Sequence, residues 1–211
     1  MSKPVAKSSS TNKPKGSNQL RIIGGQWRGR KLGFPDVDGL RPTGDRIRET
    51  LFNWLAPDIQ GAHCLDLFAG SGALGLEALS RGAESSVLLE KNALAAQHLK
   101  SNLQLLRAGN GKVEHVDSLQ WLNQQQAPHR FDIVFIDPPF ALELWEPIAA
   151  ALETHNWLSD EAVIYLEAPR DAQLQLPANW HLHRDNQAGQ VSFRLYHRHA
   201  PRPIAPKLNA M

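Results

Sequence analysis

The chain has 211 residues, of which 42% are hydrophobic and 21% are charged, and it carries a net charge of +2. These values are typical of one globular domain with extensions, and they exclude a largely disordered or fibrous protein. The single cysteine, Cys64, cannot form an internal disulfide, and its apolar neighbours predict a buried strand residue. The chain shows no signal peptide and no apolar run of membrane length, so we expect a cytoplasmic protein.

Basic residues concentrate near the N-terminus. The first 48 residues contain 11 Lys or Arg and 3 Asp or Glu, whereas the rest of the chain contains 12 and 18. A basic segment on an acidic body is typical of proteins that contact a phosphate backbone. Within it, residues 1–18 are rich in Lys, Ser, Asn and Pro, which predicts a disordered tail. For this tail a solubilising role is favoured over phosphate contact. Residues 200–211 are predicted to be a second tail.

Two short strand-like runs follow the N-terminal tail, and they flank a Gly24-Gly25 turn between residues 19 and 32. This pattern predicts a small basic hairpin. Trp27 lies among several Arg and Lys residues, and an aromatic ring between cations suits base stacking combined with phosphate contact. Packing of Trp27 on the body of the protein is an equally supported alternative.

Residues 41–46 predict a turn with capping residues, followed by a helix that ends before Pro57. Apolar residues recur there at helical spacing, which predicts one buried face formed by Ile47, Leu51, Trp54 and Leu55. We expect residues 19–58 to form an N-terminal extension and residues 59–199 to form the main domain.

Strand-like and helix-like segments alternate from residue 63 onward. The predicted strands are 63–68, 85–89, 112–116, 131–136 and 162–167, and the predicted helices are 73–81, 93–106, 118–126 and 142–154. This alternation is typical of a doubly wound, mainly parallel α/β sheet. Residues 180–184 and 191–197 predict an antiparallel hairpin at one edge, which brings the sheet to seven strands.

Ligands of open α/β sheets bind beyond the carboxyl ends of the strands, where this sequence places four acidic residues. Asp66 lies on the first predicted strand and precedes a glycine-rich loop that contains Gly70 and Gly72. Glu90, Asp117 and Asp137 follow the next three strands. The candidate cofactor contacts are Asp66, Phe68, Gly70, Gly72, Glu90, Asp117 and Asp137.

The glycine loop admits two cofactors. Gly70, Gly72 and Gly75 satisfy the dinucleotide pattern GxGxxG, and Glu90 lies near the position of a ribose-binding acid, so a nicotinamide oxidoreductase is one alternative. Asp66 opposes it, because a carboxylate there would repel a pyrophosphate but attract the cationic sulfonium and amino group of S-adenosylmethionine. We expect Glu90 to accept from the ribose hydroxyls. Asp117 could accept from the adenine amino group or cap the next helix.

The segment Asp137-Pro138-Pro139-Phe140 directly follows a buried strand. Prolines fix φ and remove N–H donors, so a rigid carbonyl of Pro138 and the Asp137 carboxylate could accept the two protons of an amino group. Phe140 could stack on the base that carries it. This predicts methylation of a base amino group with Asp137, Pro138 and Phe140 as catalytic residues. No His or Cys cluster has metal-ligand spacing, so we expect no metal.

The segments 21–32, 41–52, 66–75 and 137–140 resemble, in order, those of the RsmD family of class I methyltransferases, and the similarity runs from about residue 19 to residue 198. The resemblance implies a Rossmann-like methyltransferase that uses S-adenosylmethionine to modify the 2-amino group of a guanine in small-subunit (16S) ribosomal RNA. It implies RNA contacts for the hairpin and the following turn. The candidate RNA-binding residues are Arg21, Trp27, Arg28, Arg30, Lys31, Arg41 and Arg46. Relatives often carry an acid two positions after Glu90, where this chain has Asn92, so no cofactor role is assigned to that residue.

We expect a monomer whose partner is ribosomal RNA or an assembled or assembling small subunit, and no membrane. Two further alternatives remain open from the residues. One is an amino methyltransferase that acts on adenine or cytosine of DNA or on another RNA, because the same four-residue segment serves all of these bases. The other is an RNA-binding assembly factor without catalytic activity, against which the retained Asp66, Glu90 and Asp137 argue.

Overall fold

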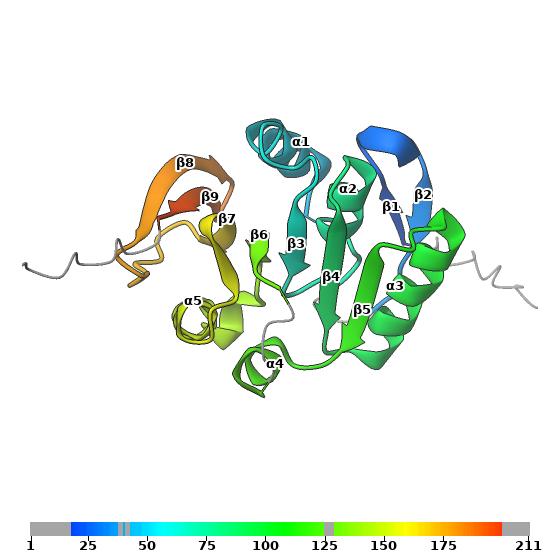
Figure 1. Ribbon diagram of the computed structural model, residues 1–211. Helices are drawn as coiled ribbons and strands as arrows, with labels where there is room; N and C mark the ends of the chain where they lie inside the picture. Colours follow the sequence, from blue (N-terminus) through cyan, green and yellow to red (C-terminus); the bar gives the residue numbers. More distant parts are fainter. Residues whose placement is uncertain (1–17, 38–39, 41–42, 125–128, 200–211) are drawn as a thin grey trace, which may run out of the picture.

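The computed structural model describes residues 18–37, 40, 43–124 and 129–199. Its centre is a seven-stranded sheet, shown in Figure 1, whose strand order is β5-β4-β3-β6-β7-β9-β8. Five strands run parallel, and β9 is antiparallel to both of its neighbours. The strands are β3 (His63–Asp66), β4 (Ser85–Glu90), β5 (Gly111–His115), β6 (Phe131–Ile136), β7 (Leu158–Pro169), β8 (Trp180–Ala188) and β9 (Val191–Arg198). The predicted fold class is therefore confirmed.

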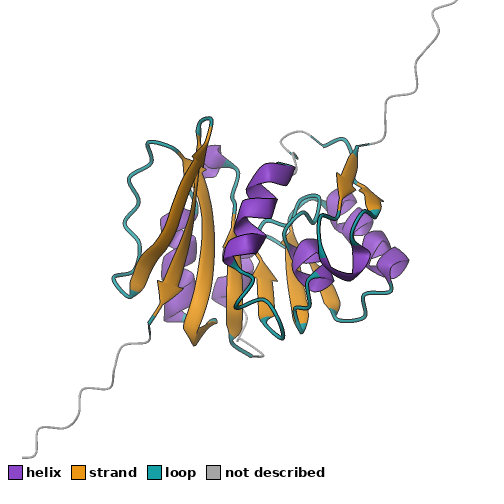
Figure 2. Cartoon of the chain, turned by 90° about the horizontal axis from the view of Figure 1, so that it is seen from above, coloured by secondary structure: helices purple, strands orange, loops and turns teal. Residues whose placement is uncertain are grey.

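Helices cover both faces of the sheet (Figure 2). They are α1 (Asp45–Trp54), α2 (Gly75–Ser80), α3 (Ala93–Leu106), α4 (Ser118–Gln124) and α5 (Trp145–Thr154), with short 3-10 turns η1 (Gly25–Trp27) and η2 (Phe140–Leu142). The central strand β6 shows why both faces need cover. Val134 and Ile136 pack in the core that includes α5, whereas Ile133 and Phe135 pack in the core that includes α1. Alternate residues of one strand thus serve two apolar layers.

The N-terminal hairpin consists of β1 (Gln19–Arg21) and β2 (Lys31–Gly33), which pair antiparallel as predicted. Leu20, Ile22 and Leu32 are at most 1% exposed. They share one apolar cluster with residues of α2 and α3, so the hairpin lies against these helices, as Figure 1 also shows. The polar face of the hairpin points away from the domain.

Helix α1 differs from the prediction in its cap and its buried face. Its N-cap is Gly44, which makes no side-chain cap hydrogen bond. The buried face contains Leu51, Phe52 and Leu55, as well as the charged residue Arg48, which is 1% exposed. Ile47 and Trp54 were predicted on this face, but they are only partly buried. The buried face is rotated from its predicted position because the guanidinium of Arg48 contacts carboxylates and backbone carbonyls beneath the hairpin.

The C-terminal hairpin extends further than the sequence indicates. Strand β8 continues past the predicted end at residue 184 as far as Ala188, and the turn is reduced to Gly189 and Gln190. Side chains 181–187 are all exposed, so this edge strand lacks the apolar alternation by which strands are recognised. In the described ranges no helix is long and apolar enough to cross a bilayer. Cys64 is fully buried, as predicted.

Candidate functional site

Five acidic residues stand at or near the carboxyl ends of five adjacent parallel strands. In the spatial order of the sheet they are Asp117 after β5, Glu90 on β4, Asp66 on β3, Asp137 after β6 and Glu167 on β7. Because parallel strands end at one edge, this topology gathers side chains that are far apart in the sequence. Four of these acids were predicted from the sequence, whereas Glu167 was not.

Asp66 is the most buried of the four predicted acids, at 3% exposed. Its Oδ2 accepts a hydrogen bond of 2.9 Å from the backbone N–H of Gly75, which ties the end of β3 to the start of α2. Burial raises the pKa of Asp66 to about 7, although hydrogen bonds from the backbone of Gly75 and Phe68 lower it, and the nearby Glu90 carboxylate raises it further. A carboxyl group in this state is poised to ionise when a cation approaches.

The glycine loop after β3 folds back onto Glu90. Gly70 and Gly72 have φ values of +52° and +83°, which L side chains rarely adopt. The N–H of Gly70 donates to Oε2 of Glu90 over 2.8 Å, and the N–H of Asn92 donates to Oε1 over 2.6 Å. These bonds orient the carboxylate and leave it lone pairs for further donors, since each carboxylate oxygen can accept two hydrogen bonds.

Asp117 caps the helix that follows it, which was one of its two predicted roles. Its Oδ1 accepts from the N–H of Gln120 over 3.1 Å, and its Oδ2 lies 3.0 Å from Nζ of Lys91. The hydrogen bond from Gln120 is the main cause of a lowered pKa for Asp117, to which Lys91 contributes. A contact between Asp117 and an adenine amino group stays a prediction.

Asp137 lies next to Thr43, whose Oγ1 is 3.5 Å from Oδ2 of the carboxylate. Loss of solvent raises the pKa of Asp137 well above its usual range, and the negative fields of Glu167 and Asp66 raise it further, while the Thr43 hydrogen bond lowers it. Pro138 behind it is buried. The site thus brings Asp66 and Asp137 close enough to influence each other.

Glu167 is 5% exposed and accepts a hydrogen bond of 2.7 Å from the hydroxyl of Tyr165 at Oε1. Burial raises its pKa, although hydrogen bonds from Tyr165 and Thr43 lower it. Thr43 therefore lies 3.5 Å from the Asp137 carboxylate and also influences the pKa of Glu167. The signal for Glu167 was present in the sequence, because the predicted strand 162–167 ends on an acid, close to where acids follow three of the other predicted strands.

Phe140 begins η2 and packs beside Trp145, with 5.8 Å between the ring centroids and a tilt of 51°. The indole Nε1 of Trp145 donates to the backbone carbonyl of Glu167 over 2.6 Å. Phe140 itself is partly buried, so part of its ring stays available for a planar ligand. An aromatic surface therefore lies three residues after Asp137 in the chain, packed against Trp145 at the start of α5.

The acid set fits S-adenosylmethionine. No ion pair in the described part of the chain neutralises Asp66, Asp137 or Glu167, although Asp66 and Glu167 are buried. Buried carboxylates favour a cationic ligand, and the sulfonium and amino group of this cofactor supply two positive charges. Among the same described residues, no cluster of three His, Cys, Asp or Glu has the arrangement of a metal site.

A buried acid, Glu77 on α2, holds the hairpin in place. Its carboxylate accepts from the backbone N–H groups of Ile23 and Gly24 over 2.8 Å and 2.7 Å. Arg81 donates to the same carboxylate over 2.7 Å, and Arg48 lies 3.6 Å from it. This cluster around Glu77 was not predicted from the sequence.

Most of the predicted RNA-binding residues are exposed. The side chain of Trp27 is partly buried against the α2 and α3 cluster, so the alternative of packing on the body of the protein is observed. The backbone N–H of Trp27 donates to the hydroxyl of Ser80. Arg21 pairs with Asp45 over 3.0 Å, and Arg41 lies outside the described residues. The residues exposed on the surface are Arg21, Arg28, Arg30, Lys31 and Arg46.

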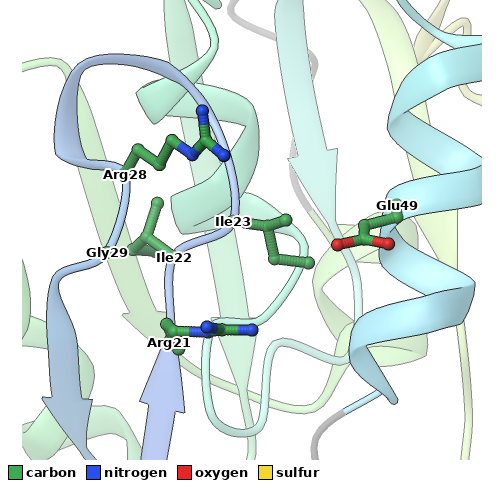
Figure 3. Close-up of a pocket in the computed structure, with 6 residues that line it drawn as sticks. All are labelled: Arg21, Ile22, Ile23, Arg28, Gly29 and Glu49. Carbon is green, nitrogen blue, oxygen red and sulfur yellow. The ribbon is translucent and has the colours of Figure 1, made fainter.

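A hollow of about 110 Å³ lies between the hairpin and α1 (Figure 3). Arg21 and Arg28 from the hairpin and Glu49 from α1 contribute its charged groups. Its remaining lining residues are Ile22, Ile23 and Gly29. The hairpin therefore offers both an exposed basic face and a recess next to it.

Comparison with known proteins places the chain in a family. The family profile described as Conserved hypothetical protein 95 matches residues 20–197. Ribosomal RNA small subunit methyltransferase D of Escherichia coli (strain K12) is 56% identical over 186 residues, which cover 88% of this chain and 93% of that protein. The solved structure of Escherichia coli yhhF has a TM-score of 0.80 and 54% identity, and the match covers 87% of this chain and 100% of that chain. A Thermus thermophilus 16S rRNA N2 G1207 methyltransferase, solved with AdoMet and guanosine, shares the fold at 20% identity, with a TM-score of 0.62 over 86% of this chain and 50% of that chain.

Proposed function

The chain belongs to the family of ribosomal RNA small subunit methyltransferase D, and we propose that it methylates the 2-amino group of a guanine in 16S ribosomal RNA. The observation that supports this most is the placement of Asp66 and Asp137 at the ends of the neighbouring strands β3 and β6. Membership of this family disfavours the nicotinamide oxidoreductase considered above.

S-adenosylmethionine, when bound, supplies an electrophilic methyl carbon. We assign its cationic groups to the region of Asp66 and its ribose to Glu90, while Gly70 and Gly72 let the backbone approach it. Phe68, at the start of the loop, would line the same site. Asp117 would reach the adenine amino group with the lone pairs that its helix cap leaves free.

The base amino group is a poor nucleophile, because its lone pair is delocalised into the ring. The Asp137 carboxylate and the Pro138 carbonyl would accept its two protons, which localises the lone pair and aims it at the methyl carbon. Phe140 would stack on the base and set its distance. No step of this mechanism requires a metal ion.

The RNA would lie across the N-terminal extension, residues 19–58, and reach the domain of residues 59–199 at the carboxyl ends of the strands. The exposed cations of the hairpin would contact phosphates in a free, assembling or assembled small subunit. Arg46, in the first turn of α1, would extend this basic surface, and we propose the same role for Arg41, which lies outside the described residues. We propose that the enzyme acts as a monomer.

Methyl transfer to ribosomal RNA tests the function directly. Purified protein with labelled S-adenosylmethionine should modify small-subunit particles from cells that lack the gene, and nucleoside mass spectrometry should identify N2-methylguanine. Asp137→Ala should abolish transfer while cofactor binding survives, whereas Asp171→Ala, which changes an exposed acid, should behave as the unmodified protein. Methylated adenine or cytosine would support the alternative base specificity, and particle binding without transfer would support an assembly factor.

A further inference from the structure

The proposed chemistry leaves one buried group without a role. Methylation of an amino group releases a proton, and Asp137 can accept it only transiently if it is to serve the next substrate. Glu167 is a second carboxyl group at the same edge of the sheet, at 5% exposure. Neither the family resemblance nor the four-residue segment at Asp137 accounts for it.

The strand register places the two acids side by side. Ile136 pairs with Leu166 across β6 and β7, so Asp137 and Glu167 each follow one residue later on adjacent parallel strands. The Thr43 hydroxyl lies 3.5 Å from Oδ2 of Asp137, and the same hydroxyl lowers the pKa of the neighbouring Glu167. A hydroxyl can donate and accept at once, so Thr43 is able to pass a proton from one acid to the other.

The surroundings make Glu167 a protected proton acceptor. Tyr165 on the same strand donates to it, and Phe193 on β9 stands opposite it in the ladder. Asp66, at the end of β3, adds negative charge to the Asp137 side of the pair. In the described part of the chain no cation faces Glu167 in an ion pair, so its charge depends on what binds in the site.

Resting on the proposed function, we infer that Glu167 is a positioning residue that takes up, through Thr43 and Asp137, the proton lost by the guanine amino group. As nitrogen bonds to the methyl carbon, the carbon–sulfur bond breaks and its electron pair stays on sulfur. The amino proton passes to the Asp137 carboxylate. Thr43 accepts that proton on its oxygen and gives its own to Glu167, which returns Asp137 to the ionised state.

This route keeps the charge of the site constant. The sulfonium cation becomes a neutral thioether in the same event that converts one carboxylate into a carboxylic acid. Burial makes charge separation costly, so the two changes stabilise each other. The pair Asp137–Glu167 should therefore bind one more proton beside the thioether product than beside the sulfonium substrate.

Calorimetry measures this difference without any methyl transfer. Binding of S-adenosylmethionine and of S-adenosylhomocysteine, each in two buffers of different ionisation enthalpy at pH 7, gives the protons exchanged with each ligand. For the unmodified protein we expect the product to be bound with about one more proton than the substrate, because one positive charge is missing. In Glu167→Gln that difference should fall by at least about half. An unchanged difference in this variant would overturn the inference.

Rate measurements test the relay itself. Thr43→Val should slow a single turnover about tenfold or more, within the range typical of proton-transfer catalysis, and Thr43→Ser should restore the rate. Tyr165→Phe removes a donor to Glu167, so the pH midpoint of the reaction should move upward, whereas Glu167→Gln removes negative charge near Asp137 and should move it downward. Opposite shifts would not arise from general destabilisation, which circular dichroism monitors. If both variants have normal pH profiles and the unmodified protein transfers the methyl group, Glu167 has no part in the proton relay. The proposed function would then be unaffected.

Discussion

Arg48 and Glu77 form an ion pair wholly buried beneath the N-terminal hairpin, with Nη1 of the guanidinium 3.6 Å from Oε2 of the carboxylate. The other nitrogens of Arg48 donate to the carbonyls of Thr43 and Arg21 over 3.1 Å and 3.0 Å. Glu77 holds the N–H groups of the hairpin turn at the same time. One cluster of charges therefore joins the hairpin, α1, α2 and Thr43, whose hydroxyl lies near Asp137.

Removing the charge of Glu77 should destabilise the whole protein. In Glu77→Gln the buried Arg48 keeps Asp45 at 2.6 Å but loses the Glu77 carboxylate, and weakening the hydrogen bonds and ion pairs of a buried charged group typically costs about 1.5–3 kcal/mol. Urea unfolding should show this loss, whereas Glu84→Gln, which changes an exposed acid, should stay within about 0.5 kcal/mol. Equal stability of the two variants would show that the contacts of Glu77 do not stabilise the fold.

Gly25 and Gly29 offer a matched test of how closely the hairpin approaches α2. Both have positive φ, at +75° and +84°, but a β-carbon at Gly25 would lie 1.7 Å from the carbonyl oxygen of Ser80, whereas at Gly29 it would meet nothing within 4 Å. Gly29→Ala should cost about 1 kcal/mol from backbone strain alone. Gly25→Ala should cost clearly more in thermal unfolding and weaken RNA binding, because the hairpin must move. Similar costs at the two positions would show that the hairpin is loosely held.

Asp66 should make the protein less stable as pH rises. Its pKa is about 7 in the folded protein and near 3.8 when unfolded, so between these values the folded state binds more protons. Stability then falls with rising pH, by up to about 1.4 kcal/mol per unit from this group. Asp66→Asn should flatten the dependence between pH 4 and 7 in denaturant unfolding. A slope identical to that of the unmodified protein would show that other groups cause it.

The same ionisation should control cofactor affinity. S-adenosylmethionine carries positive charge and favours ionised Asp66, so its binding to the unmodified protein should tighten as pH rises from about 6 to 8. In Asp66→Asn the affinity should be weaker and less dependent on pH. Isothermal titration at three pH values is sufficient to detect this, and tighter binding at low pH would contradict it.

The basic face of the hairpin should bind RNA in a salt-sensitive way. Replacing Arg28 and Arg30 by Ala removes exposed charges, so binding to small-subunit particles should weaken more at 50 mM than at 300 mM salt, because released counterions drive such contacts. Arg130→Ala changes an exposed arginine at the opposite end of β6 and serves as the control. A loss of binding that is independent of salt would indicate misfolding instead.

The sequence predicts the sheet and its edge of acids because both depend on local periodicity. Strand-helix alternation implies parallel strands, and parallel strands bring Asp66, Glu90 and Asp137 to one edge. The burial of Glu77 and Arg48 could not be predicted, since a charged residue on a helix is expected to be solvent-exposed unless its distant partners are known. Glu167 stood at the end of a predicted strand, but its importance depends on the register of β7 against β6.

Strand β8 ends the sheet with its outer side unpaired in the described structure, and seven consecutive side chains, 181–187, point into solvent. An open strand edge is a template on which another chain can add a strand. Here charged, imidazole and amide groups would have to be desolvated by any such addition. The polar composition of this strand thus opposes edge-to-edge association of the protein.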